Sequence, residues 1–85
     1  MASYKLLIKP SAVKELEAVP PKDPRKVAAK IQALAGDARP HGSEKLYGQE
    51  RYRLRHGDYR VVYAIDDDER TVLVVKIGNR RDIYR

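Results

Sequence analysis

The fold of this chain is decided by one stretch, Arg51-Tyr52-Arg53-Leu54-Arg55-His56-Gly57-Asp58-Tyr59-Arg60. Apolar and aromatic residues alternate in it with arginines, and this period of two is typical of a β-strand with one buried face. Gly57-Asp58 then predicts a two-residue hairpin turn, because glycine supplies the positive φ that such turns require. A strand over 51–56 is therefore expected to pair with a second strand that begins at Tyr59.

The register of this hairpin sorts its side chains by face. If Gly57-Asp58 is the turn, Arg55 lies opposite Arg60, and directly opposite residues in an antiparallel pair share a face. Four guanidinium groups on one face repel each other and are expected to contribute nothing to folding, so we expect an anionic ligand there. The tyrosines of the other face are expected to be the aromatic packing of the core. The first face carries Arg51, Arg53, Arg55 and Arg60, and the second carries Tyr52, Leu54, Tyr59, Val61 and Tyr63.

Prolines and apolar spacing predict the elements that precede this hairpin. Residues 3–9 predict a short strand, and Pro10-Ser11 opens a helix that ends at Pro20-Pro21, where the hydrogen-bond ladder cannot continue. The apolar stripe of this helix is Val13, Leu16 and Val19.

A second helix begins with Asp23 as its N-cap and Pro24 as its first helical residue. Gly36 closes this helix, and we expect the two helices to pack as an antiparallel hairpin. The apolar stripe of the second helix is Val27, Ile31 and Leu34.

The remaining residues complete an α+β fold. Residues 37–48 predict a loop, and strands over 59–65 and 71–77 are joined by an acidic turn, residues 66–69, which we expect to be a solvated loop tip. The order is one strand, a two-helix hairpin and a three-stranded antiparallel meander. This order predicts a small twisted sheet with helices on one face and the arginines on the other.

Composition narrows the class of protein. The 85 residues predict one domain over 1–85, and no apolar run approaches the roughly 20 residues that span a bilayer. The chain opens directly with a strand-like pattern, so we expect no signal peptide. The absence of cysteine excludes disulfides and thiolate metal sites and favours the cytoplasm, and two histidines are too few for a zinc site. We expect no metal and no small-molecule cofactor.

The positive charge predicts a polyanionic partner. The net charge is +6, with seven lysines and two arginines up to Glu50, and eight arginines and one lysine from Arg51 onward. Arginine presents a planar fork that holds phosphate with two hydrogen bonds. The carboxyl-terminal half is therefore expected to recognise phosphate.

Three segments together resemble the RelE/ParE superfamily of bacterial toxins, and they are most similar to its RelE branch. They are Lys45-Leu46-Tyr47-Gly48, the stretch from Tyr52 to Tyr63, and Gly78-Asn79-Arg80-Arg81-Asp82-Ile83-Tyr84. The resemblance covers essentially the whole chain. It implies an endonuclease that enters the A site of the 70S ribosome, cleaves messenger RNA without a metal, and is inhibited by a cognate acidic antitoxin. The ribose 2′-hydroxyl attacks the adjacent phosphate and leaves a cyclic phosphate and a 5′-hydroxyl.

The resemblance also implies roles for single residues. Arg60 and Arg80 match arginines that stabilise the phosphate, and Tyr84 matches a tyrosine that stacks on or orients the nucleotide. Arg51 and Arg53 stand where the best-known members have lysines, and a guanidinium holds phosphate but is a poor proton donor or acceptor. The general acid and base therefore stay open. Expected contacts to the RNA backbone are Arg55, Arg81 and Lys45.

Two other functions remain open. ParE-type toxins share this fold and poison DNA gyrase, although they generally lack the tail tyrosine and the concentrated arginine face. A non-catalytic nucleic-acid-binding module also fits the arginine cluster. The substitution Arg60→Ala distinguishes a nuclease from such a module, because it should lower the cleavage rate on the order of 10²-fold.

Overall fold

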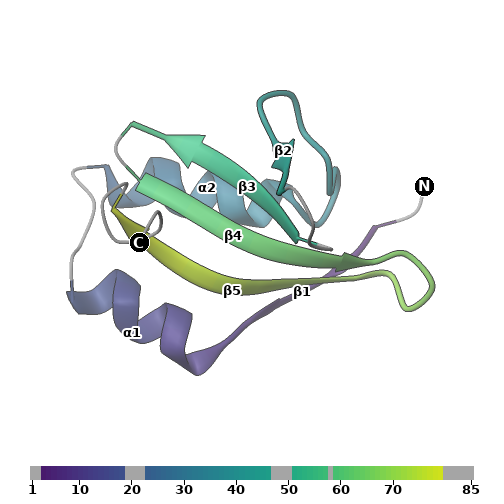
Figure 1. The fold of residues 1–85 in the computed structure, drawn as a ribbon, viewed down its shortest axis with the longest axis horizontal. Helices are drawn as coiled ribbons and strands as arrows, with labels where there is room; N and C mark the ends of the chain where they lie inside the picture. Colours follow the sequence, from purple (N-terminus) through teal and green to yellow (C-terminus); the bar gives the residue numbers. More distant parts are fainter. Residues whose placement is uncertain (1–2, 19–22, 47–50, 58, 80–85) are drawn as a thin grey trace.

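The computed structural model describes residues 3–18, 23–46, 51–57 and 59–79. Figure 1 shows the chain passing from one strand through two helices into a run of antiparallel strands. The elements are β1 (Lys5–Ile8), α1 (Pro10–Ala18), α2 (Pro24–Ala33), β2 (Glu44–Lys45), β3 (Arg51–His56), β4 (Tyr59–Asp66) and β5 (Thr71–Asn79).

The strands form one five-stranded mixed sheet in the order β1-β5-β4-β3-β2. Strand β1 runs parallel to β5, and the other neighbouring pairs are antiparallel. A parallel pair needs a crossover connection, and the two helices lie within it (Figure 1). The expected α+β fold is confirmed. The expectation that the two helices pack as an antiparallel hairpin is wrong: α1 packs on β5, whereas α2 lies behind β3 and β4 (Figure 1). Within the described residues, each helix buries its apolar side chains against the sheet and not against the other helix.

The predicted register of the β3–β4 hairpin is also confirmed. Arg55 lies opposite Arg60, and His56 lies opposite Tyr59. Gly57 has a φ of 58°, which is the left-handed conformation that the turn prediction requires.

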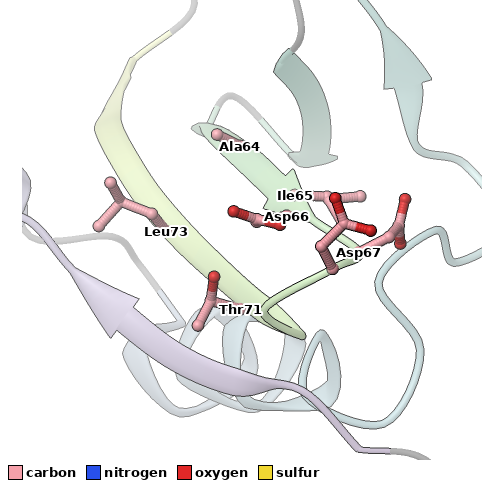
Figure 2. Close-up of a pocket in the computed structure, with 7 residues that line it drawn as sticks. Ala64, Ile65, Asp66, Asp67, Thr71 and Leu73 are labelled. Atoms are coloured by element: carbon pink, nitrogen blue, oxygen red, sulfur yellow. The ribbon is translucent and has the colours of Figure 1, made fainter.

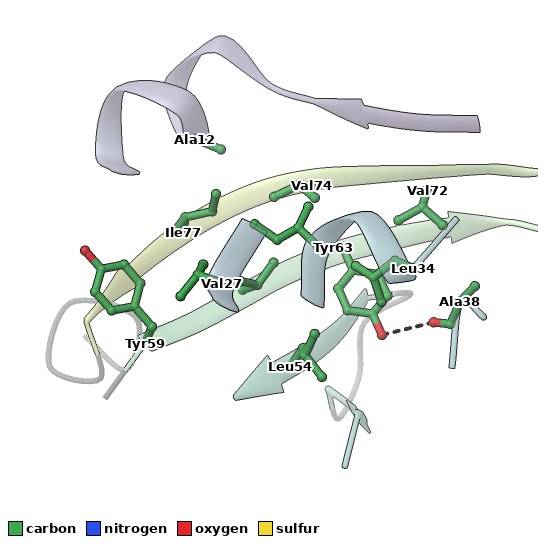
Figure 3. Packing of buried hydrophobic residues seen from close by; sticks show 12 residues of the cluster. Ala12, Val27, Leu34, Ala38, Leu54, Tyr59, Tyr63, Val72, Val74 and Ile77 are labelled. Atoms are coloured by element: carbon green, nitrogen blue, oxygen red, sulfur yellow. Dashed lines mark hydrogen bonds between the residues drawn. The ribbon is translucent and has the colours of Figure 1, made fainter. Parts of the chain in front are cut away.

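The core lies between the helices and one face of the sheet (Figure 3). The stripe of α2 is buried as predicted, and Tyr59 and Tyr63 are core residues, with Tyr52 packed against them. The Tyr63 hydroxyl donates to the carbonyl of Ala38 at 3.0 Å, so its polar end is satisfied inside the core. The buried side chains from the helices and from the segment after α2 are Ala12, Val27, Ile31, Leu34 and Ala38.

The stripe predicted for α1 is confirmed at Leu16 and wrong at Val13. Ala12 is fully buried, whereas Val13 is 39% exposed. Helix α1 packs mainly on β5 through Ala12 and the partly buried Leu16, which lie four residues apart on the same side of a helix. Val19 lies outside the described residues.

The expected loop over 37–48 contains a short strand that the prediction missed. Glu44 lies opposite Arg53 and Lys45 lies opposite Tyr52, so β2 extends the sheet beyond β3. Two residues are too few to show a period, so no pattern in the sequence marked them.

The turn between β4 and β5 is more than a solvated loop tip. Arg39 holds the Asp67 carboxylate with two hydrogen bonds, of 2.9 and 3.2 Å, and Tyr4 donates to the same carboxylate at 2.5 Å. Arg39 also lies 5.2 Å from the centre of the Tyr52 ring. The hairpin turn is therefore tied to Tyr4, the residue before β1, and to Arg39 in the segment after α2, which itself contacts β3.

No helix in the described part of the chain is long and apolar enough to cross a membrane.

Candidate nucleic-acid interface

The open face is the face of the sheet turned away from the core, and the register arranges its side chains in rows that run across the strands. Residues directly opposite each other share a face, so each row is fixed by the strand pairing. From the β3–β4 turn outward, the rows are Arg55–Arg60–Gly78, then Glu44–Arg53–Val62–Lys76, then Arg51–Ala64–Leu73–Leu7.

Arg60 lies in the first row and is buried, with only 4% of its surface exposed. Its Nη1 donates to the carbonyl of Gly57 at 2.9 Å and to the carbonyl of Tyr59 at 3.0 Å. Gly78, on the neighbouring strand, has no side chain to fill the space beside it. The guanidinium is therefore held against the hairpin turn, with its orientation fixed by the backbone.

Arg53 and Arg55 converge on one carboxylate from β2. Arg53 Nη2 lies 2.7 Å from Glu44 Oε2, and Arg55 Nη2 lies 3.9 Å from Glu44 Oε1. The Arg53 side chain is 13% exposed, whereas that of Arg55 is 54% exposed. Glu44 offsets part of the repulsion among the arginines.

The expectation that the four arginines contribute nothing to folding is therefore wrong. Arg53 and Arg60 are hydrogen-bonded and largely covered, and each satisfies acceptors that belong to the sheet or its turn. Arg51 and Arg55 are exposed, as a surface that meets a ligand requires.

Lys45 does not share the open face. It lies opposite Tyr52, a residue of the core side, and it belongs to an edge strand two residues long. Likewise, His56 lies opposite Tyr59 and is on the core side, as strand parity predicts.

The remaining predicted site residues, Arg80, Arg81 and Tyr84, lie outside the described residues. Their roles stay predictions from the sequence.

Lys76 is a site residue that the sequence did not reveal. Strict alternation from the buried Val72 and Val74 would place it in the core. A bulge between the partners of Val62 and Tyr63 shifts the pairing, so that Lys76 lies opposite Val62 on the open face. Its Nζ lies 2.8 Å from Oε2 of Glu15, which is on α1.

A depression of about 620 Å³ lies at the far end of the sheet from the β3–β4 turn (Figure 2). Three successive aspartates line it, and no basic residue of the described part of the chain does, so these side chains repel phosphate. Its lining residues are Ala64, Ile65, Asp66, Asp67, Asp68, Thr71 and Leu73.

In the described ranges, no three His, Cys, Asp or Glu side chains are grouped so that they could hold a metal ion. The chemistry that these residues offer is therefore that of guanidinium and ammonium groups next to carboxylates. Such groups hold phosphate and stabilise negative charge that develops on it.

Comparison with known proteins places this arrangement in a family. A family model described as "ParE toxin of type II toxin-antitoxin system, parDE" matches residues 6–84. The chain is 32% identical over 87 residues to Toxin RelG of Mycobacterium tuberculosis, covering 96% of this chain and 97% of that protein. It is 34% identical over 87 residues to Toxin RelE of the same organism, covering 96% and 87%.

A solved structure shows the same fold. The archaeal RelE in a RelE–RelB complex from Pyrococcus horikoshii superposes with a TM-score of 0.79 at 27% identity, over 92% of this chain and 96% of that one. The resemblance seen in the sequence is thus confirmed, and the chain belongs to the RelE/ParE superfamily as a toxin of the type II toxin–antitoxin class.

Proposed function

We propose that this toxin is a ribosome-dependent endoribonuclease that cleaves messenger RNA in the A site. The observation that carries the proposal is the register, which gathers five basic side chains on the open face. These are Arg51, Arg53, Arg55, Arg60 and Lys76. Two relatives of this chain are named Toxin RelE and Toxin RelG, and these names also support the ribonuclease proposal.

In the proposed reaction, the ribose 2′-oxygen attacks the adjacent phosphorus and the bond to the 5′-oxygen breaks. Negative charge grows on the phosphorane, and pre-oriented positive groups stabilise it without reorganising. Arg60 suits this task, because its backbone contacts already fix its position. Arg51 and Arg53 hold the phosphate, and Arg80 and Tyr84 complete the site as predicted from the sequence.

The proposed partners are the 70S ribosome with its messenger RNA, and a cognate antitoxin. An acidic antitoxin that folds on binding would neutralise the open face. The archaeal relative was crystallised as a complex with RelB, which supports a partner of this class. The proposed substrate is found in the cytoplasm.

A second candidate function is DNA gyrase poisoning. The family model that matches residues 6–84 is named for ParE, and this name favours the gyrase reading. Against it, five basic side chains share the open face, which suits an RNA backbone.

The deciding experiment uses a purified translation system with a defined messenger RNA stalled at a known A-site codon. Primer extension maps 5′ ends after addition of wild type, Arg60→Ala or Tyr84→Phe, each at a matched concentration of folded protein. We expect ribosome-dependent cuts within the codon, and a loss on the order of 10²-fold for Arg60→Ala. Intact RNA in every lane would overturn the nuclease, and a parallel supercoiling assay with gyrase would then separate poisoning from simple binding.

A further inference from the structure

The open face carries one lysine beside its arginines, and this lysine is held in place. Lys76 lies opposite Val62 in the second row, and Arg60 lies opposite Gly78 in the first. Lys76 and Arg60 are thus diagonal neighbours on adjacent strands, a relation that places residues roughly 7–8 Å apart. A lysine side chain at this distance can reach a phosphate bound on the open face beside Arg60.

Glu15 fixes this lysine at the edge of β5. One carboxylate oxygen lies 2.8 Å from Lys76 Nζ, and the other accepts a hydrogen bond of 3.3 Å from the backbone N–H of Ile77. The side chains of Lys76 and Glu15 are 42% and 32% exposed. An ammonium has three donors, so Lys76 can keep its bond to Glu15 and still donate to a ligand on the open face.

Proton transfer is the function that the arginines of this face cannot supply, since a guanidinium does not give up its proton in proteins. Among the described residues of the open face, the other side chains that exchange protons are Lys5, Glu44 and Asp66. Lys5 and Asp66 share a row with Thr71 at the acidic end of the sheet. Glu44 lies on β2, two strands from β4, whereas Lys76 lies on β5, next to β4. Among these described residues, Lys76 is therefore the proton donor nearest Arg60.

We propose that Lys76 is the general acid of the ribonuclease reaction, and that it protonates the leaving 5′-oxygen. This inference rests on the proposed function. As the P–O5′ bond breaks, an N–H bond of Lys76 breaks and an O–H bond forms on the 5′-oxygen. The 2′-hydroxyl releases its proton to water, and the neutral amine takes a proton back from water. Glu15 is a positioning residue, because its carboxylate holds the Lys76 ammonium at 2.8 Å.

The test replaces the leaving oxygen with sulfur. A messenger RNA is synthesised with one 5′-bridging sulfur at the linkage that the wild-type protein cuts. A thiolate leaves without being protonated, so the sulfur linkage does not need a general acid. Lys76→Arg keeps the positive charge, but a guanidinium does not give up its proton to the leaving oxygen as an ammonium can. Lys5→Arg makes the same change at the acidic end of the open face and serves as the matched control.

We expect Lys76→Arg to cleave the oxygen linkage on the order of 10²-fold more slowly than wild type, and to cleave the sulfur linkage as fast as wild type. Lys5→Arg should match wild type on both linkages. Glu15→Gln should also raise the ratio of the sulfur-linkage to the oxygen-linkage cleavage rate, but by a smaller factor than Lys76→Arg does.

Three outcomes would overturn the inference. If Lys76→Arg cleaves the oxygen linkage like wild type, Lys76 transfers no proton. If it slows both linkages by the same factor, Lys76 acts by charge or position and is not the acid. If wild type cuts no linkage of the unmodified messenger RNA, the proposed nuclease itself is wrong, and that result is distinct because it appears without any substitution.

Discussion

Glu44 limits how much positive charge the open face offers to a ligand. It contacts Arg53 at 2.7 Å and Arg55 at 3.9 Å. We expect Glu44→Gln to tighten binding of a labelled single-stranded RNA by up to about fivefold in fluorescence anisotropy, because an ion pair this exposed is worth at most about 1 kcal/mol. Glu17→Gln on α1 changes the net charge equally and touches neither arginine. Equal tightening by both variants would mean that net charge alone, and no local pair, governs binding.

Arg60 is as much a structural residue as a binding one. It is 4% exposed and donates to two backbone carbonyls at the hairpin turn. Arg60→Ala leaves those acceptors without this donor, so the free energy of unfolding in urea should fall by about 1–3 kcal/mol. Arg55→Ala, in the same row but 54% exposed, should change it by less than about 0.5 kcal/mol. Indistinguishable midpoints for the two variants would contradict a folding role for Arg60.

At the scale of elements, the ion pair between Arg39 and Asp67 holds the tip of the β4–β5 hairpin against the segment after α2. Hydrogen bonds from Arg39, and then from Tyr4, lower the pKa of the Asp67 carboxyl below its ordinary value of 3.8. The same contact with Asp67 raises the pKa of the Tyr4 hydroxyl. Because the pKa of Asp67 is lowered on folding, its contribution to stability is complete well above pH 3.8 and is lost as the pH falls through the folded value.

The lowered pKa of Asp67 predicts how the effect of a substitution at the hairpin tip on the melting temperature depends on pH. The melting temperature of Asp67→Asn should lie below that of wild type at neutral pH, and the gap should narrow as the pH falls below about 3.8. Asp68→Asn makes the same change one residue along the turn and should show no such narrowing. A gap for Asp67→Asn that stays constant down to pH 2 would show that the Asp67 contacts do not stabilise the fold.

The features that the sequence analysis missed are those in which apolar and polar residues do not alternate regularly. The β3–β4 register followed from strict alternation and the glycine turn, and it placed every residue of that hairpin on the correct face. The bulge on β5 breaks alternation, so parity assigned Lys76 to the wrong side. The two-residue strand that carries Glu44 has no alternation to detect. A lysine between Val75 and Ile77 was the one visible sign that parity fails there.

For the whole molecule, the order of the longer elements and the open face were predictable from the sequence, whereas the pairing of charges across that face was not. Sequence shows how many charges a chain carries, but not which of them pair. Arg53 meets Glu44 through a two-residue strand that has no sequence pattern, and Lys76 meets Glu15 from an element far away in the chain. The net charge of +6 is consequently a poor guide to where a polyanion binds. A measurement is needed that distinguishes binding through the basic side chains of the open face from binding through the net charge of the whole surface.

The salt dependence of RNA binding distinguishes these two modes of binding. About four phosphate contacts on single-stranded RNA give a slope near −3 in log affinity against log salt. Replacing the exposed Arg51 and Arg55 by alanine should reduce the slope to about −1.5, because two contacts disappear. Replacing the exposed helix residues Lys14 and Lys26 lowers the net charge equally, from +6 to +4, and should leave the slope near −3. If both double variants flatten the slope alike, RNA is bound by the diffuse charge of the whole surface, and the open face is not the interface.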